Sequence, residues 1–200
     1  MPSRYRGTTF GSQMFAEGTT LLIYMSLPRA FPEIKTKNLI LRRLVPQDRK
    51  AIFMLRNDKE VNRFIRRDIM NSETEGLAFI EKIWSNGDRG PDVFWAICLN
   101  TQPDPIGSVC LWNFSEDQKL AELGYELFPV FQGRGLMSEA VKAVLDYAFN
   151  HLKLTTIEAY THKDNIPSKK MLVKFQFRHV PDKMDTDNEN IEVYSLQLPK

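Results

Sequence analysis

The sequence predicts a single mixed α/β domain, with a mostly antiparallel sheet of about seven strands flanked by about four helices. Strand-like runs and helical patterns follow one another without an internal repeat, which favours one sheet with helices on its faces. Three consecutive strand-like runs are separated only by short turn-forming segments, which indicates an antiparallel meander. The length of 200 residues lies within the range of one domain. We assign residues 34–200 to this domain and expect residues 1–33 to be a poorly specified leader.

Composition limits the classes of function. Hydrophobic residues make up 42% and charged residues 26%, and the net charge is only +2. Because the two signs are interspersed, nothing draws the whole chain to nucleic acid or to a membrane. The 2 cysteines, Cys98 and Cys110, lie in strand-like runs, and the 3 histidines lack metal-ligand spacing. We expect a cytoplasmic monomer or homodimer with buried reduced thiols and no metal.

The N-terminal half predicts one strand and two helices. Residues 38–45 suit a first strand, and Pro46-Gln47-Asp48 then breaks the strand and opens a helix that runs to about Asn57. A second helix is predicted to start at Thr74-Glu75 and to stop at Ser85-Asn86-Gly87.

The meander and the strongest helix follow. The three strand-like runs are Val93–Leu99, Ile106–Asn113 and Lys119–Phe128, and Pro129 ends the third. A continuous apolar stripe at helical spacing then predicts a helix from Leu136. Its residues are Leu136, Ala140, Val141, Val144, Leu145, Ala148, Phe149 and Leu152.

The C-terminal part predicts three strands and one helix. A strand over Thr155–Thr161 precedes a helix over residues 165–174, which Asn165 can cap. Two strands are predicted near Phe177–Val180 and Ile191–Leu198. The polar, mainly acidic segment between them, residues 182–190, is expected to be a solvated loop.

The segment Phe128–Ser138 carries the chemistry. A strand ends there, Gly133 and Gly135 follow, and the amphipathic helix begins at once. Glycines allow a sharp turn and close approach to a ligand. The N–H groups at a helix start have no intrahelical partner and lie at the positive end of the helix dipole, so this junction predicts a phosphate site. Arg134 can add a charge-assisted hydrogen bond.

Two common nucleotide loops fit this segment poorly. The Walker pattern Gly-x-x-x-x-Gly-Lys-[Ser/Thr] is absent. In the dinucleotide pattern Gly-x-Gly-x-x-Gly, Ser138 stands at the position of the third glycine. The segment is also preceded by a predicted meander rather than by a βαβ unit. Binding of NAD or ATP remains an alternative.

The run Gln132-Gly133-Arg134-Gly135-Leu136-Met137 resembles the Gln/Arg-x-x-Gly-x-Gly/Ala loop of the GNAT N-acetyltransferases. Met137 replaces the last small residue, so its side chain must point away from the phosphates. Other segments resemble the Rim-type branch, which acetylates protein N-termini: Asn38–Leu44, Glu122-Leu123-Gly124-Tyr125, Asn165-x-x-Ser168-x-Lys170 and residues 172–177, where Gln176 replaces a usual glycine. The similarity spans about residues 37–198.

The resemblance implies a GNAT-like fold with a splayed cleft for acetyl-CoA, and it implies a role for each matching residue. The backbone of Leu127 and Phe128 would bind the pantetheine arm and polarise the thioester carbonyl. Asn165 would hydrogen-bond the arm, Ser168 would lie near the sulfur, and Lys170 would meet a phosphate. The loop amides that would hold the pyrophosphate belong to Gln132, Gly133, Arg134, Gly135, Leu136, Met137 and Ser138.

The catalytic residues are less well defined. Many relatives place a tyrosine that acts as the general acid at the position that Leu172 occupies here. A phenol at that position is therefore excluded as the general acid of this protein. Ser168 is the substitute acid, and the alternative is that it only caps or packs its helix. Glu122 and Glu126 share a strand face and are the candidate bases for the amine. The alternative for both is a solvated edge or a salt bridge, and Glu192 is a weaker third candidate.

These observations predict transfer of an acetyl group from acetyl-CoA to a primary amine, by direct attack in a ternary complex. The acceptor suggested by the Rim-type resemblance is a protein N-terminal α-amine. A small amine such as a polyamine, an aminoglycoside or an amino acid is one alternative, and a non-catalytic acetyl-CoA sensor is another. Arg63, Arg66 and Arg67 either line an acceptor entrance that favours acidic peptides or form a solvated basic loop.

Overall fold

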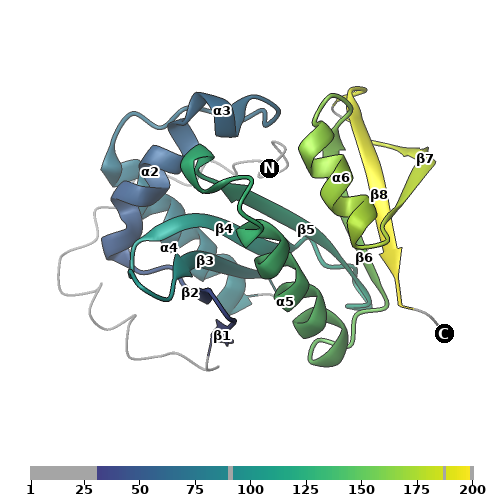
Figure 1. The fold of residues 1–200 in the computed structure, drawn as a ribbon, viewed down its shortest axis with the longest axis horizontal. Coiled ribbons are helices and arrows are strands. Elements are labelled where there is room, and N and C mark those ends of the chain that lie inside the picture. Colours follow the sequence, from purple (N-terminus) through teal and green to yellow (C-terminus); the bar gives the residue numbers. More distant parts are fainter. Residues whose placement is uncertain (1–30, 90–91, 187, 199–200) are drawn as a thin grey trace.

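An eight-stranded sheet in the order β1-β2-β3-β4-β5-β6-β8-β7 forms the centre of the molecule (Figure 1). The computed structural model describes residues 31–89, 92–186 and 188–198. The strands are β1 (Ile34–Lys35), β2 (Leu39–Arg43), β3 (Val93–Leu99), β4 (Pro105–Trp112), β5 (Leu120–Leu127), β6 (Thr156–His162), β7 (Arg178–Met184) and β8 (Ile191–Gln197). All neighbours pair antiparallel except β5 and β6, which run parallel. The predicted mixed, mostly antiparallel sheet is confirmed.

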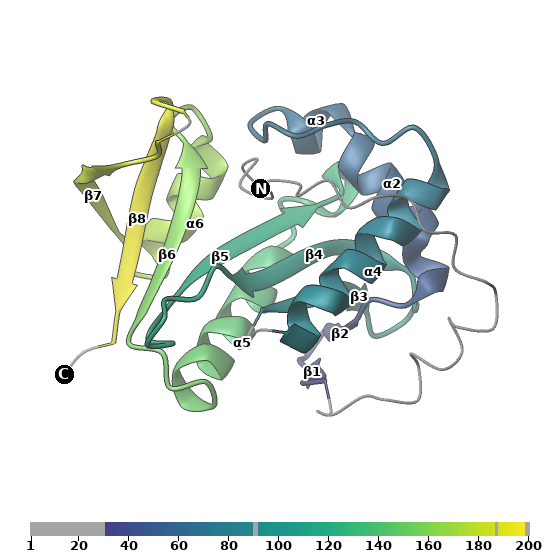
Figure 2. The ribbon, with the colours of Figure 1, turned by 180° about the vertical axis from the view of Figure 1, so that it is seen from behind.

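Helices cover both faces of this sheet. The helices are α2 (Arg49–Asn57), α3 (Lys59–Asn62), α4 (Glu73–Arg89), α5 (Leu136–Asn150) and α6 (Ile166–Lys174), with short 3-10 turns η1 (Pro46–Asp48) and η2 (Pro129–Phe131). α5 and α6 lie on one face, and α2 and α4 lie on the other (Figures 1 and 2). The sheet therefore has an apolar core on each side.

The alternation of side chains along the strands supplies these two cores. On the α5 face, Trp95 and Ile97 of β3 are fully buried together with Val141 and Val144 of α5. On the opposite face, the core contains Ile52 of α2 and Ile80 of α4, and also Phe94, Ala96, Cys98, Cys110 and Trp112. Both cysteines are free and buried, as predicted.

Several boundaries differ from the prediction. The two-residue β1 and the four-residue α3 were not predicted, because such short elements leave little periodic signal. α4 continues to Arg89, past Ser85-Asn86-Gly87. Serine, asparagine and glycine each lower helix propensity by only about 1 kcal/mol or less, which packing elsewhere in a helix can override.

The segment predicted as a loop over residues 182–190 is in part a strand. β7 runs to Met184 and pairs with β8. Its side chains are almost all exposed, so the apolar alternation that marks a half-buried strand is missing from its sequence. β7 is an edge strand of the sheet, and its hydrogen bonds rather than its side chains define it.

Residues just before residue 34, the predicted start of the domain, already pack against the core. The rings of Phe31 and Trp95 lie 6.0 Å apart, edge to face, and Trp95 Nε1 donates a hydrogen bond to Pro32 O at 2.6 Å. Residues 31–33 therefore pack on the domain. Residues 1–30 of the predicted leader lie outside the described residues.

The sheet is split between its two parallel strands. β5 pairs with β6 only where Leu120, Ala121 and Glu122 face Thr156, Ile157 and Glu158. Beyond this point β5 continues to Leu127 and β6 to His162 with no pairing between them, and the strands diverge (Figure 1). The divergence opens the sheet toward its α3 end.

Candidate active site

A cavity of about 650 Å³, here called the loop cavity, lies in this split. Its wall combines the end of β5, the turn before α5, the first turns of α5 and α6, and the segment Glu60–Ile65. The turn contributes Gln132, Gly133 and Gly135, and α6 contributes Pro167, Ser168 and Met171. The fold thus brings the predicted glycine loop and the predicted Asn-x-x-Ser helix to one site.

The glycines of the loop are required by backbone conformation. Gly133 has φ +70° and Gly135 has φ +77°, in the left-handed region where side chains are strained. A Cβ atom at either position would meet no atom within 4 Å, so crowding is not the reason for glycine there. Gly135 is the N-cap of α5, and its C=O accepts a hydrogen bond from Glu139 N–H.

The first turn of α5 has the geometry of the predicted anion site. The N–H groups of Leu136, Met137 and Ser138 precede the first intrahelical bond and have no acceptor within the helix. They lie at the positive end of the helix dipole and their residues line the loop cavity. This geometry suits the pyrophosphate predicted for the loop.

Side chains around the loop have distinct arrangements. Gln132 Nε2 donates to Leu127 O at 2.9 Å and so closes the turn. Arg134 is exposed, its guanidinium lies 5.8 Å from the centre of the Phe131 ring, and it is not part of the cavity wall. Met137 is partly buried against the core and also lines the loop cavity.

Two lysines of α6 differ in their distance from the loop. Lys174 Nζ donates to Ser138 Oγ at 3.3 Å, which places a cation beside the anion site. Sequence reasoning did not single out Lys174. Lys170 is exposed and does not line the loop cavity, although it lies one helical turn before Lys174 on the same face.

The end of β5 offers one of the two predicted backbone groups to the cavity. Phe128 N–H donates to Ile106 O of β4, so it is already used within the sheet. Because successive residues of a strand point their backbone groups to opposite sides, Leu127 and Tyr125 direct theirs toward the split. Leu127 N–H is thus the better placed of the predicted pair.

The start of α6 has the arrangement that the sequence predicted, with one addition. Asn165 caps the helix, because its Oδ1 accepts from Ser168 N–H at 3.3 Å. The Ser168 hydroxyl is not used for capping: its Oγ lies 2.8 Å from the phenol oxygen of Tyr125. Burial raises the pKa of Tyr125 to about 12, although the bond to Ser168 acts to lower it.

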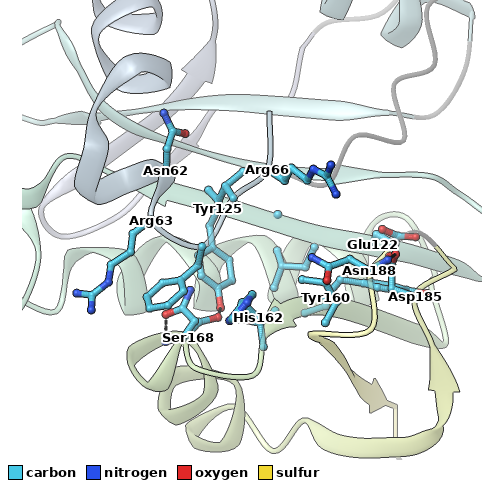
Figure 3. A pocket seen from close by; sticks show the side chains of 18 of the residues that line it. Asn62, Arg63, Arg66, Glu122, Tyr125, Tyr160, His162, Ser168, Asp185 and Asn188 are labelled. Atoms are coloured by element: carbon cyan, nitrogen blue, oxygen red, sulfur yellow. Dashed lines mark hydrogen bonds between the residues drawn. The ribbon is translucent and has the colours of Figure 1, made fainter. Parts of the chain in front are cut away.

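A second cavity of about 640 Å³, here called the strand cavity, adjoins the first (Figure 3). The two cavities share Arg63, Phe64, Ile65, Tyr125, Asn165 and Ser168. Figure 3 shows Tyr125, Ser168 and His162 close together, with Glu122, Asp185 and Asn188 forming a polar group farther along. The Tyr125–Ser168 hydrogen bond therefore lies at the junction of the two cavities.

The candidate bases have very different surroundings. Glu122 is buried and lines the strand cavity, where Asn113 Nδ2 donates to its Oε1 at 2.5 Å. Glu192 forms an ion pair with Lys169 at 2.8 Å and lies in neither cavity wall. Among the predicted carboxylates, only Glu122 lies in the strand cavity.

Glu126 lies on the same strand face as Glu122, as predicted, but it is part of a buried ion pair. Arg67 Nη2 bonds to its Oε2, and Ser108 Oγ donates to its Oε1 at 3.1 Å. Burial would raise the pKa of Glu126, but the charges of Arg67 and Arg56 outweigh this and lower it to about 2. A carboxylate with this pKa is a weak base, so the environment of Glu126 favours the predicted salt-bridge alternative.

The three arginines of the predicted basic loop lie in different surroundings. Arg63 and Arg66 are exposed and line the strand cavity. Arg67 is buried against Glu126, and its Nε donates to Asn62 Oδ1 at 2.6 Å. The segment between α3 and α4 is thereby fixed to the sheet.

Within the residues that the structure describes, no group of three or more histidine, cysteine, aspartate or glutamate side chains is placed to hold a metal ion. No helix in the same ranges is both long enough and apolar enough to cross a membrane.

The splayed sheet, the glycine turn and the capped α6 define an acyl-transferase architecture, and comparison with known proteins agrees. The chain belongs to the GNAT family of acetyltransferases: its residues 38–178 match the family's acetyltransferase domain. It is 30% identical over 148 residues to the uncharacterized N-acetyltransferase YoaA of Bacillus subtilis, covering 74% of this chain and 84% of that protein.

Solved structures share the fold. RimL, a ribosomal L7/L12 α-N-protein acetyltransferase in complex with coenzyme A, has a TM-score of 0.71 at 19% identity, covering 84% of this chain and 98% of that chain. The microcin C7 self-immunity acetyltransferase MccE, in complex with acetyl-CoA and AMP, has a TM-score of 0.70 at 17% identity, covering 82% of this chain and 94% of that chain. The predicted family and fold are confirmed, and the protein is an enzyme that transfers an acetyl group to an amine.

Proposed function

We propose that this enzyme transfers the acetyl group of acetyl-CoA to a primary amine, with a protein N-terminal α-amine as the preferred acceptor. The observation that carries the proposal is the meeting of two cavities at Tyr125 and Ser168. The loop cavity contains the first N–H groups of α5, and its one buried carboxylate, Glu126, is paired with Arg67. The strand cavity contains the buried carboxylate of Glu122. Two substrates bound one in each cavity can thus meet at one point, which is the requirement for direct attack in a ternary complex.

The loop cavity fits acetyl-CoA. Leu136, Met137 and Ser138 would hold the pyrophosphate through their N–H groups, with Lys174 beside them. Asn165 uses its oxygen for capping, which leaves its amide N–H₂ available to the pantetheine arm. Leu127 N–H would polarise the carbonyl. When bound, acetyl-CoA supplies an activated acetyl thioester.

The strand cavity fits the amine. An amine must lose a proton to become a nucleophile, and a carboxylate can accept it directly or through one water. Glu122 lies in the wall of this cavity, whereas Glu126 is held by Arg67. We therefore assign proton acceptance to Glu122.

Replacing Glu122 with glutamine is expected to lower kcat/KM for the amine by roughly 10²-fold or more, the usual contribution of a general base. Glutamine keeps an acceptor for Asn113 Nδ2 but cannot take a proton. The check is a pH–rate profile of the purified variant, which should differ in shape from that of the wild type. A profile identical to that of the wild type would remove Glu122 from this role.

Two classes of acceptor have support. RimL, which has the same fold, is a ribosomal L7/L12 α-N-protein acetyltransferase, and this supports a protein N-terminus as the acceptor. The volume of about 640 Å³ also lies within the usual range for small-molecule sites, which supports a small amine as the second candidate.

The experiment combines acetyl-CoA with peptides that carry a free α-amine, the same peptides with a blocked α-amine, and a panel of polyamines, aminoglycosides and amino acids. Thiol release reports turnover and mass spectrometry locates the acetyl group. Acetylation of free but not blocked peptides would support the N-terminal acceptor, and acetylation of small amines alone would replace it with the second candidate. Binding of acetyl-CoA without transfer to any amine would contradict catalysis and indicate a sensor.

A further inference from the structure

The hydrogen bond between Tyr125 and Ser168 joins two elements that lie far apart in the sequence. Tyr125 belongs to β5 and Ser168 to the first turn of α6. Their oxygens lie 2.8 Å apart, and both residues line both cavities. In Figure 3 the phenol of Tyr125 points toward Ser168.

Resting on the function proposed above, we propose that Tyr125 acts through Ser168 as a positioning and proton-supplying residue, so that the pair forms a proton path from the strand cavity to the loop cavity. Position 172, where a phenol acid would otherwise be placed on α6, holds Leu172, which is buried in the core. The phenol instead comes from β5. It contacts Ser168, about one helical turn before position 172.

The donors and acceptors of Ser168 show what the phenol of Tyr125 contributes to the pair. A serine hydroxyl has one proton to donate and accepts through its oxygen. The backbone N–H of Ser168 is already used with Asn165 Oδ1, and the hydroxyl takes no part in capping. When the phenol donates to Ser168 Oγ, the serine proton is left free to point into the loop cavity. Because burial raises the pKa of Tyr125 to about 12, the phenol keeps its proton at neutral pH and can donate it.

The proton path balances the transfer reaction. The amine nitrogen forms a bond to the carbonyl carbon, the C–S bond breaks, and its electron pair leaves with the sulfur. Ser168 gives its proton to that sulfur, and Tyr125 gives its own proton to Ser168 Oγ. The attacking nitrogen loses one N–H proton to Glu122, directly or through water, and this proton returns to the phenol through the strand cavity. An amine that arrives protonated first releases its additional proton to solvent. Nothing is oxidised or reduced.

The test compares Tyr125→Phe, Ser168→Ala and the double variant with the wild type. Each single change is expected to lower kcat by roughly 10²-fold, with little change in KM for acetyl-CoA, because the groups act on the leaving sulfur. The double variant should be no slower than the slower single one, since residues that act as a unit are non-additive. The control is Tyr147→Phe, which should leave kcat unchanged. The Tyr147 ring, on α5, packs on Trp95 of β3 and on His151, which follows α5.

A second measurement needs no acetyl-CoA. Urea unfolding of the four proteins should give a double-variant loss smaller than the sum of the two single losses, because the bond is broken by either change. Additive losses would show that the bond does not form in solution, and they would overturn the proposal.

Kinetic outcomes separate this proposal from the proposed function. If the wild type acetylates amines and Tyr125→Phe keeps its full kcat, the role of Tyr125 is overturned and the proposed function is not. The same holds if the kcat losses of the two single variants multiply in the double variant. A wild type that transfers no acetyl group would overturn the proposed function, and this inference would fall with it.

Discussion

Replacing Gly135 with aspartate is expected to weaken binding of acetyl-CoA at least a hundredfold while the protein still folds. Gly135 caps α5 next to the three N–H groups that have no acceptor within the helix and that form the predicted anion site. A Cβ atom there meets no neighbour within 4 Å, so the new side chain has room. Its negative charge would lie against the pyrophosphate, where like charges repel strongly at close range. Isothermal titration with acetyl-CoA measures the change.

The matched control is Gly135→Asn, which has the same shape without the charge. Both variants must adopt φ +77°, and asparagine and aspartate tolerate the left-handed region better than other side chains do. We expect the asparagine variant to lose far less affinity than the aspartate variant. Equal affinities of the two variants, or an aspartate variant that binds as the wild type does, would contradict the loop assignment.

Replacing Glu126 with glutamine is expected to lower the free energy of unfolding by about 3–5 kcal/mol, because it leaves Arg67 buried without its counter-charge. For a domain of this size, that loss lowers the melting midpoint by roughly 6–20 °C. Glu116→Gln, at an exposed position in the turn before β5, is the control and should change stability by no more than about 0.5 kcal/mol. Thermal and urea unfolding check both. A Glu126→Gln variant as stable as the wild type would contradict the structural role of the pair.

The same ion pair gives a signed pH dependence. The pKa of Glu126 falls from 4.5 to about 2 in the folded protein, so its contribution to stability is complete above the unfolded pKa. That contribution is lost as the pH falls from about 4.5 toward 2. The stability difference between wild type and Glu126→Gln should therefore shrink across this window. A difference that stays constant there would contradict the lowered pKa.

The outline of the site could be predicted from the sequence because its signals are local. The two glycines, the amphipathic helix after them and the Asn165 cap lie within short stretches, and each has a direct physical reading. The alternation of β5 likewise placed Glu122 and Glu126 on one face. These local rules predict the fold class, which the structure confirms, and the position of the glycine turn at the start of α5.

The contacts that distinguish the side chains could not be predicted in this way. Arg67 and Glu126 are 59 residues apart, and Tyr125 and Ser168 are 43 apart. Such pairs depend on how β5 meets α6 and the α3–α4 segment, which no local pattern specifies. The side chain of Tyr125 lies on the face of β5 opposite to that of Glu126. It reaches the split because β5 and β6 stop pairing before this point, and the sequence of β5 alone does not show this.

Binding of acetyl-CoA in the loop cavity is the central claim, and thermal unfolding of the purified protein with acetyl-CoA, NAD and ATP in separate samples tests it most directly. A ligand at a hundred times its dissociation constant adds about 2.7 kcal/mol of stability, which should raise the midpoint by roughly 5–10 °C. We expect this rise with acetyl-CoA and not with NAD or ATP, and we expect Gly135→Asp to abolish it. A rise with NAD or ATP but none with acetyl-CoA would contradict the account.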